Sequence, residues 1–175
     1  MIKKLTLLLF ILALPLSAKM ITSPIDAMKS TFGADCEVSK KNILLNSSRA
    51  KMIQKNAKVK LTSKIFRTFK AIKDGEIQGY GILINRKIRS KNGVVLFMIN
   101  KDSLLESIEV IAFNEPMEYI PSKKWLIQFD KVPTDKKLRV GRDIATVTGA
   151  TLSARSVTDG SRLAFAFYNE MLKEK

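Results

Sequence analysis

"KIFRTFKAIKDGEIQGYGILINRKI", residues 64–88, consists of two runs rich in apolar residues on either side of a Lys-Asp-Gly sequence. In the second run, apolar and polar residues alternate around Tyr80, Ile82 and Ile84. Alternation with a period of two is typical of a strand that buries one face, and an Asp-Gly pair between two such runs indicates a tight turn. The segment therefore predicts a β-hairpin.

Two further strands are expected directly after this hairpin. "SKNG" at residues 90–93 supplies the next turn, and "VVLFMIN" at 94–100 is a short, continuous apolar run. "KDS" at 101–103 turns the chain again before "IEVIAFNE" at 108–115. Four consecutive strands joined by tight turns predict an antiparallel meander.

Three shorter segments carry helix signals. "SPIDAMKSTFG", residues 23–33, places serine at the N-cap, proline at the first helical position and glycine past the end. "SSRAKMIQKNAK", residues 47–58, predicts a second helix, capped by Ser47 or Ser48. "SKKWLIQF", residues 122–129, is expected to form one or two helical turns, with its Trp and Phe as an i, i+4 pair on the inner face.

The final helix is expected over residues 152–173. Leu163, Phe167 and Met171 lie at i, i+4 and i+8 and form an apolar stripe. Gly160 would weaken the middle of this helix by up to about 1 kcal/mol relative to alanine. The predicted fold class is therefore α+β, an antiparallel β meander packed with helices, the last of which starts at the sequence TGAT.

The first 18 residues have the features of a signal peptide. "MIKK" is a positive n-region, "LTLLLFILALPL" is an apolar run too short to span a membrane comfortably, and "LSA" ending at Ala18 is a cleavage site. No cysteine stands at the cleavage point, which argues against a lipoprotein anchor. The mature chain is therefore expected to be one exported, periplasmic domain, residues 19–175. An uncleaved signal anchor is the alternative.

Cysteine and histidine usage excludes several chemistries. The chain has one cysteine, Cys36, and no histidine. It can form no internal disulfide, no Ser-His-Asp or Cys-His nucleophile system, no His-rich zinc site and no CxxCH haem attachment. Cys36 is expected to be a half-buried, small hydrophobic residue rather than a reactive thiol.

The chain is strongly basic, with a formal net charge of +15. Nine basic and no acidic residues occur between Arg49 and Lys73. Most of the cations are lysines, which bind phosphate less specifically than arginine, and no RNP motif, KH loop or zinc finger is present. We therefore expect no nucleic-acid partner. The remaining interpretations are a solvated lysine-rich surface, an acidic partner or peripheral contact with an anionic membrane.

"TVTGATLSARSVTDG", residues 146–160, combines hydroxyl side chains with a Gly-Ala pair just before the final helix. If that helix begins near Thr151, its free N–H groups and the positive end of its dipole point at the TGAT sequence, and suit an anion such as phosphate. Alternatively, Thr148 and Thr151 only cap a helix after a turn that contains glycine. Residue types alone leave both interpretations open.

The same stretch resembles the signature of FMN-binding domains found in the C subunit of sodium-pumping NADH:quinone oxidoreductase, the G subunit of the Rnf complex and NosR-type regulators. Their shared pattern is Asp-x-x-Ser/Thr-Gly-Ala-Thr. Its last threonine is joined to FMN through a phosphoester by a flavin transferase that uses FAD. The resemblance implies that Thr151 carries FMN. It also implies Thr148, Gly149 and Ala150 as cofactor-binding residues, and Leu152, Ser153 and Arg155, which follow within about one helical turn, are the further candidates.

The resemblance extends upstream of TGAT and covers about residues 65–172. "FNEPMEYIPSKKWLIQF", residues 113–129, and "LRVGRDI", residues 138–144, resemble the segments that precede the motif in exported, stand-alone members. One position departs from the pattern, because its leading Asp, which the transferase recognises, falls on Ala145. Either Asp143 substitutes for it, or covalent modification is inefficient or absent and FMN is bound without a covalent bond.

The resemblance implies a periplasmic electron carrier rather than an enzyme. It would be the substrate of a flavin transferase and would exchange electrons with a membrane-associated or periplasmic redox partner. No catalytic or metal-ligating residue is expected. The alternatives are a flavin-dependent reductase of a small extracytoplasmic substrate, a protein that binds FMN non-covalently, and a binding or scaffold protein without flavin.

Four residues near the motif invite functional hypotheses. Glu115 and Glu118 form a carboxylate pair, but beside a proline they are expected to fix a loop or face solvent. Trp125 and Tyr119 could stack on a flavin, but aromatic residues at helical spacing usually belong to the core.

Overall fold

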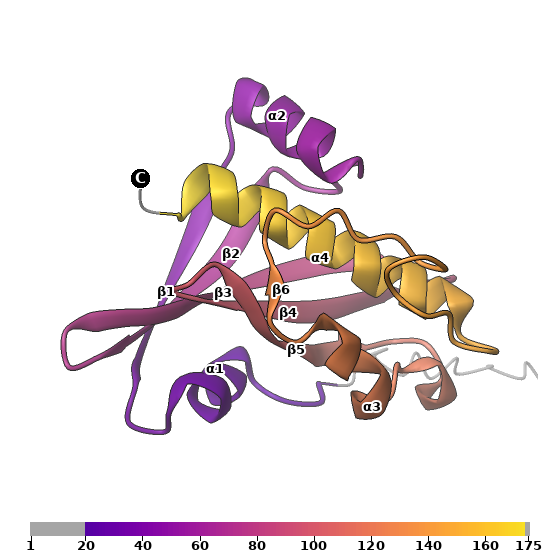
Figure 1. Ribbon diagram of the computed structural model, residues 1–175, viewed down its shortest axis with the longest axis horizontal. Coiled ribbons are helices and arrows are strands. Elements are labelled where there is room, and N and C mark those ends of the chain that lie inside the picture. Colours follow the sequence, from indigo (N-terminus) through magenta and orange to yellow (C-terminus); the bar gives the residue numbers. More distant parts are fainter. Residues whose placement is uncertain (1–19, 174–175) are drawn as a thin grey trace, which may run out of the picture.

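The computed structural model describes residues 20–173, which form one antiparallel sheet with helices on both faces (Figure 1). The predicted signal peptide lies outside the described residues. The sheet order is β1-β2-β3-β4-β5-β6, so every strand pairs with its neighbours in sequence. The strands are β1 (Glu37–Leu44), β2 (Ile65–Lys73), β3 (Glu76–Lys87), β4 (Asn92–Asn100), β5 (Leu104–Phe113) and β6 (Val132–Pro133).

The predicted meander is confirmed as strands β2 to β5. Thr68 lies opposite Ile82, and Ile82 lies opposite Phe97, so these residues form one row across β2, β3 and β4 in the middle of the sheet. Strands β1 and β6 extend the sheet at its two edges and were not predicted. Strand β1 has mostly exposed side chains, and β6 has two residues, so neither gives the alternating pattern that identifies a strand in sequence.

Within residues 20–173, four α-helices and two 3₁₀ turns accompany the sheet. Their bounds are α1 (Pro24–Phe32), α2 (Ser47–Ala57), η1 (Met117–Tyr119), α3 (Lys123–Leu126), η2 (Ile127–Phe129) and α4 (Thr151–Met171). Helix α1 has the predicted caps, since the Ser23 hydroxyl accepts a hydrogen bond from the Asp26 N–H at 3.0 Å and Gly33 follows the last turn. Helix α3 and turn η2 confirm the prediction for residues 122–129, with the Trp125 and Phe129 ring centroids 5.3 Å apart.

The predicted cap of α2 is wrong. Ser47 is already helical, and the residue before it, Asn46, has the extended backbone of an N-cap. The Asn46 side chain accepts a hydrogen bond from the Arg49 N–H at 2.9 Å. Asparagine and serine are almost equally good caps, so the order Asn-Ser-Ser does not reveal which of them holds the position.

The sheet separates two cores. Helix α1 covers one face, where Met28, Phe69 and Met98 are buried with Cys36, which at 2% exposure is more deeply buried than predicted. Helix α4 covers the other face, and α2 lies over α4 (Figure 1). Leu163 and Phe167 of the predicted stripe are fully buried there. Phe167 also stacks on Phe66 at 4.3 Å.

Helix α4 runs antiparallel to strand β3. Tyr80, early in β3, contacts Tyr168 near the end of the helix, whereas Arg86, late in β3, contacts Asp159 in its first half. The turn between β3 and β4 therefore lies toward the N-terminal end of α4, where the TGAT sequence is.

Glu115 holds this β3–β4 turn in place. Its Oε1 atom accepts hydrogen bonds from the backbone N–H groups of Arg89, Ser90 and Lys91 at 3.1, 2.6 and 2.7 Å. These bonds, that of Lys91 above all, hold the pKa of Glu115 below its usual value, although its burial acts in the opposite direction. The expectation that Glu115 fixes a loop is confirmed, and Glu118 is exposed.

We expect Glu115→Gln to lower the unfolding temperature near neutral pH, by an amount that shrinks in acid. The pKa of Glu115 is lower in the folded chain than in the unfolded chain, where it is about 4.3. Its carboxylate therefore stabilises the fold above that value, and the contribution is lost as the pH falls through the folded-state pKa. Thermal unfolding from about pH 7 to pH 2 measures this, with the exposed Glu118→Gln as control. A deficit that stays constant over this range would contradict the assignment.

Candidate functional site

The TGAT sequence forms the turn that leads into α4. The Ala150 N–H donates to the Val147 carbonyl at 3.1 Å, and Gly149 has φ +78°, a left-handed conformation that glycine adopts without strain. Thr151 is the first residue of the helix. The predicted starting point of the final helix is therefore confirmed to within one residue.

The threonines do not cap this helix, so that interpretation is wrong. The N-cap residue is Ala150, which has no side-chain acceptor, and the Thr151 hydroxyl donates to the Val147 carbonyl at 3.3 Å. The first hydrogen bond of the helix is from the Ala154 N–H to the Ala150 carbonyl at 3.1 Å. Within residues 20–173, the N–H groups of residues 151–153 have no acceptor. They therefore remain available to an anion.

The residues around the turn differ in exposure. Thr148, Gly149, Leu152 and Arg155 are exposed, and Thr151 is half-buried. These five can meet a ligand from solvent. Ala150 and Ser153 are buried, at 6% and 1% exposure, and the Ser153 Oγ atom has no hydrogen-bond partner in the described structure. The fold thus brings all seven predicted residues to one helix start, but two of them face the interior.

Helix α3 and turn η2 brace the segment before the motif. The Trp125 indole N–H donates to the Ala145 carbonyl at 2.9 Å, and the Ala145 N–H donates to the Gln128 side chain at 2.6 Å. Trp125 also packs on Phe129. Together with Gln128 it holds the backbone of Ala145, which precedes TGAT. Gln128 was not predicted, because a single amide in a helical turn carries no sequence signal for such a bond.

Asp143, the alternative to the missing motif aspartate, is held in a turn by Arg139. It lies in a turn in which its N–H donates to the Arg139 carbonyl, and its carboxylate pairs with the Arg139 guanidinium at 3.9 Å. Ile144, the next residue, is buried, whereas Asp143 and Ala145 are both exposed.

Tyr119 contacts the β3–β4 turn. The Arg89 guanidinium lies 4.2 Å from the centre of the Tyr119 ring, a cation–π contact. Tyr119 is therefore engaged with an arginine, and its ring is only half-buried.

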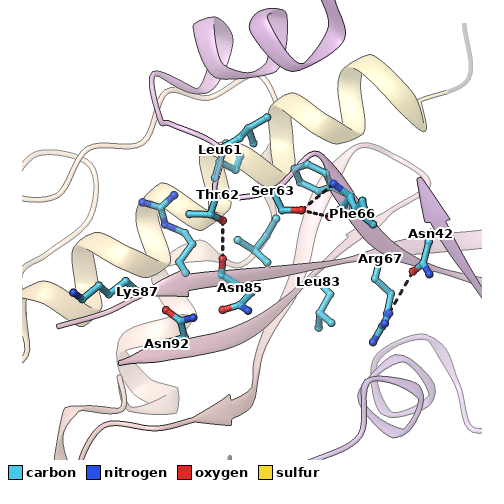
Figure 2. Close-up of a pocket in the computed structure, with 14 residues that line it drawn as sticks. Asn42, Leu61, Thr62, Ser63, Phe66, Arg67, Leu83, Asn85, Lys87 and Asn92 are labelled. Carbon is cyan, nitrogen blue, oxygen red and sulfur yellow. Dashed lines mark hydrogen bonds between the residues drawn. The ribbon is translucent and has the colours of Figure 1, made fainter. Parts of the chain in front are cut away.

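A hollow of about 470 Å³ lies beside the N-terminal part of β2 (Figure 2). Thr62 and Ser63 line one side of it, and Asn85 and Asn92 line another. Among the described residues, the cations that line it are Arg67, Arg86 and Lys87, and none of the lining side chains is a carboxylate. None of its lining residues belongs to the TGAT sequence. Arg86, which lines it, pairs with Asp159, and Asp159 is about two helical turns beyond Thr151. Its amides, hydroxyls and cations can bind and orient a polar or anionic molecule.

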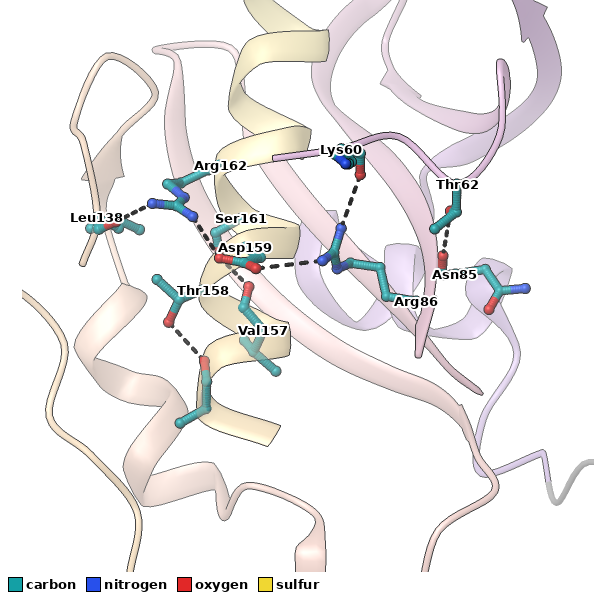
Figure 3. Close-up of polar contacts among 11 residues, drawn as sticks. Lys60, Thr62, Asn85, Arg86, Leu138, Val157, Thr158, Asp159, Ser161 and Arg162 are labelled. Atoms are coloured by element: carbon teal, nitrogen blue, oxygen red, sulfur yellow. Dashed lines mark hydrogen bonds and ion pairs between the residues drawn. The ribbon is translucent and has the colours of Figure 1, made fainter. Parts of the chain in front are cut away.

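Arg86 also belongs to a half-buried charge cluster with Asp159 and Arg162 (Figure 3). The two oxygens of Asp159 accept from Arg162 at 2.6 Å and from Arg86 at 3.4 Å. Arg162 also donates to the Leu138 carbonyl, and Arg86 to the Lys60 carbonyl. Burial lowers the pKa of the Arg86 guanidinium, an effect that Asp159 opposes. One carboxylate thus joins β3, α4 and two loops.

We expect Asp159→Asn to lower the free energy of unfolding by about 2 kcal/mol, because two half-buried guanidinium groups lose the one carboxylate that pairs with them within residues 20–173. The value is below the ~3–5 kcal/mol of a fully buried pair, since solvent screens this one. Urea unfolding measures it. Asp130→Asn removes an exposed carboxylate and should change stability by less than about 0.5 kcal/mol. Equal effects of the two substitutions would contradict the role of Asp159.

Comparison with known proteins does not identify a family. No protein-family model matches the chain, and no curated protein matches it significantly. The resemblance to FMN-binding domains therefore depends on the residues quoted above. Of the helices formed by residues 20–173, none has the length and apolar character needed to cross a membrane.

Proposed function

We propose that the protein is an exported electron carrier that binds FMN at the start of α4, joined to Thr151 through a phosphoester. One observation carries the proposal: the TGAT sequence ends at the first residue of an uncapped helix. The N–H groups there have no acceptor among the described residues, and Thr151 is half-buried. A phosphate on Thr151 would lie at the positive end of a helix of 21 residues.

The residues present fit the phosphate end of FMN. Gly149 has no side chain to obstruct the turn, and nothing lies within 4 Å of the position that a Cβ would occupy there. Thr148 and Arg155 are exposed and can donate to phosphate oxygens. The Ser153 hydroxyl, in the first turn, faces the interior and has no hydrogen-bond partner among the described residues, so it is not one of these donors.

Attachment requires a flavin transferase and FAD. The Thr151 oxygen forms a bond to the phosphorus on the flavin side of FAD, the pyrophosphate bond breaks, and AMP leaves. The hydroxyl proton passes to the transferase. A covalent bond suits an exported protein, because a dissociating cofactor would be lost where free FMN is scarce. When bound, the flavin supplies the redox chemistry, and the protein supplies its position and electrostatic surroundings.

A carrier is favoured because the described site offers anion-binding groups and no set of acid–base residues. It would exchange electrons with a membrane-associated or periplasmic partner, and its basic surface could contact an anionic membrane. We propose no nucleic-acid partner. The hollow of Figure 2 favours one alternative, a flavin-dependent reductase whose small polar substrate binds beside Arg86 and Lys87. FMN held without a covalent bond is the other alternative.

The colour and redox behaviour of the protein isolated after co-expression with a flavin transferase test the proposal. A yellow protein that is reduced and reoxidised reversibly, without turnover of small acceptors, is expected of a carrier. Turnover of a small acceptor would favour the reductase. A colourless protein would contradict both.

Ala145→Asp restores the aspartate of the family pattern, and we expect it to raise the rate at which the transferase modifies Thr151. Ala145 is exposed, so the substitution should leave the fold intact. The flavin-labelled fraction after a fixed time with transferase and FAD measures the effect. Ala145→Asn has the same size without the charge and should behave like the wild type. An unchanged rate for Ala145→Asp would show that this position is not recognised.

A further inference from the structure

A second, strongly basic hollow of about 450 Å³ lies between α2 and α4. Four lysines and an arginine line it, with a single carboxylate. The cations are Lys55, Lys58, Lys136, Lys137 and Arg162, and the carboxylate is Asp135. They come from the end of α2, the loop after β6 and the middle of α4. Among the ion pairs of residues 20–173, none involves these four lysines.

The loop that carries two of the lysines is fixed against α4. The Thr134 hydroxyl contacts the Asn169 side-chain oxygen at 2.9 Å, and the Asn169 amide donates to the Thr134 carbonyl, also at 2.9 Å. The Lys136 N–H closes a turn onto the Pro133 carbonyl at 3.0 Å. The backbone that carries Lys136 and Lys137 is therefore held in place before a ligand arrives, which lowers the cost of binding.

The base of the hollow carries an excess of positive charge. Arg162 shares the carboxylate of Asp159 with Arg86, so the cluster has two cations and one anion (Figure 3). The Arg162 Nε atom is buried and has no acceptor within the described residues. An uncompensated charge is costly in a half-buried position, and a nearby anion offsets that cost.

We infer that this hollow is a binding site for a polyvalent, phosphate-bearing anion. Five cations against one carboxylate match a ligand of several negative charges, and lysine ammonium groups bind phosphate as point charges. Arg162 is eleven residues beyond Thr151, about 16 Å along the helix axis, so the site is separate from the proposed flavin attachment. The ligand is either a soluble oligophosphate or the headgroup of an anionic phospholipid.

Isothermal titration with inorganic tripolyphosphate tests the site. We expect saturable binding that weakens with added salt. The double variant Lys55→Gln/Lys137→Gln should raise the dissociation constant about fivefold to tenfold, as expected for the loss of two charge contacts. The matched control Lys29→Gln/Lys101→Gln removes two exposed charges outside the hollow and should leave the dissociation constant within about twofold of the wild type. Circular dichroism checks that both variants fold.

Sedimentation with phosphatidylglycerol vesicles separates the two sources. Vesicle binding that tripolyphosphate displaces, and that the Lys55→Gln/Lys137→Gln variant loses, would identify a lipid headgroup. Tripolyphosphate binding without vesicle binding would identify a soluble anion. The absence of saturable binding, or an equal loss in both double variants, would overturn the site and leave only diffuse surface charge.

Discussion

Thr151→Ala is expected to abolish covalent flavin attachment completely. The phosphoester requires a hydroxyl oxygen, and alanine supplies none at the position where α4 begins. The Thr151 hydroxyl makes one long hydrogen bond of 3.3 Å to the Val147 carbonyl. The N-cap residue is Ala150, so Thr151 makes no capping bond that the substitution would remove. Stability should therefore change little. Flavin fluorescence of the denatured protein band, after co-expression with transferase and FAD, measures attachment.

Two variants control this experiment. Thr148→Ala removes a neighbouring exposed hydroxyl and should retain covalent flavin. Thr151→Ser keeps a hydroxyl on the same backbone atom and should retain at least part of the modification. Flavin that persists in Thr151→Ala would place the attachment on another residue. Loss in Thr148→Ala alone would point to that residue instead.

Gly160→Ala is expected to lower the free energy of unfolding by about 1–3 kcal/mol, as overpacking does in a core. A Cβ at this position would lie 2.6 Å from the Cζ atom of Phe97, whose ring is fully buried between α4 and the sheet. In an exposed helix the same substitution would gain up to about 1 kcal/mol. Chemical unfolding of the two proteins gives the difference directly.

Phe97→Leu provides the test of the mechanism. Leucine lacks the ring atoms that a Cβ on residue 160 would meet. The loss of unfolding free energy caused by Gly160→Ala should therefore be smaller in the Phe97→Leu protein than in the wild type, by at least about 1 kcal/mol, as expected for residues in contact. If the two substitutions are additive, or if Gly160→Ala stabilises the wild type, then Gly160 is not required by the approach of α4 to Phe97.

The sequence predicted the central strands and the last helix because each has a local pattern. Residues 64–88 alternate around an Asp-Gly turn, and the stripe that contains Leu163 and Phe167 follows the helical period. Strand β1 lacks such a pattern, since its side chains are exposed at the sheet edge. Gly160 predicted a weak point in the helix, whereas its role is a contact with Phe97, which is distant in sequence.

For the site, sequence identified the helix start but not its chemistry. Thr148 and Thr151 were candidate caps by residue type, yet the N-cap residue is Ala150 and Thr151 is the first helical residue. The sequence predicted that Glu115 fixes a loop, but not that this loop is the β3–β4 turn. The hydrogen bonds that join Trp125 and Gln128 to Ala145 also connect separate segments, and no local pattern indicates which segments meet.

The central claim is that Thr151 carries FMN, and the intact mass of the denatured mature protein from its native host tests it most directly. Modification at one residue adds about 438 Da, the mass of FMN less one water. We predict this increment, and its absence in Thr151→Ala. An unmodified mass from a yellow preparation would replace the phosphoester with non-covalent binding. An unmodified mass from a colourless preparation would contradict the flavin assignment altogether.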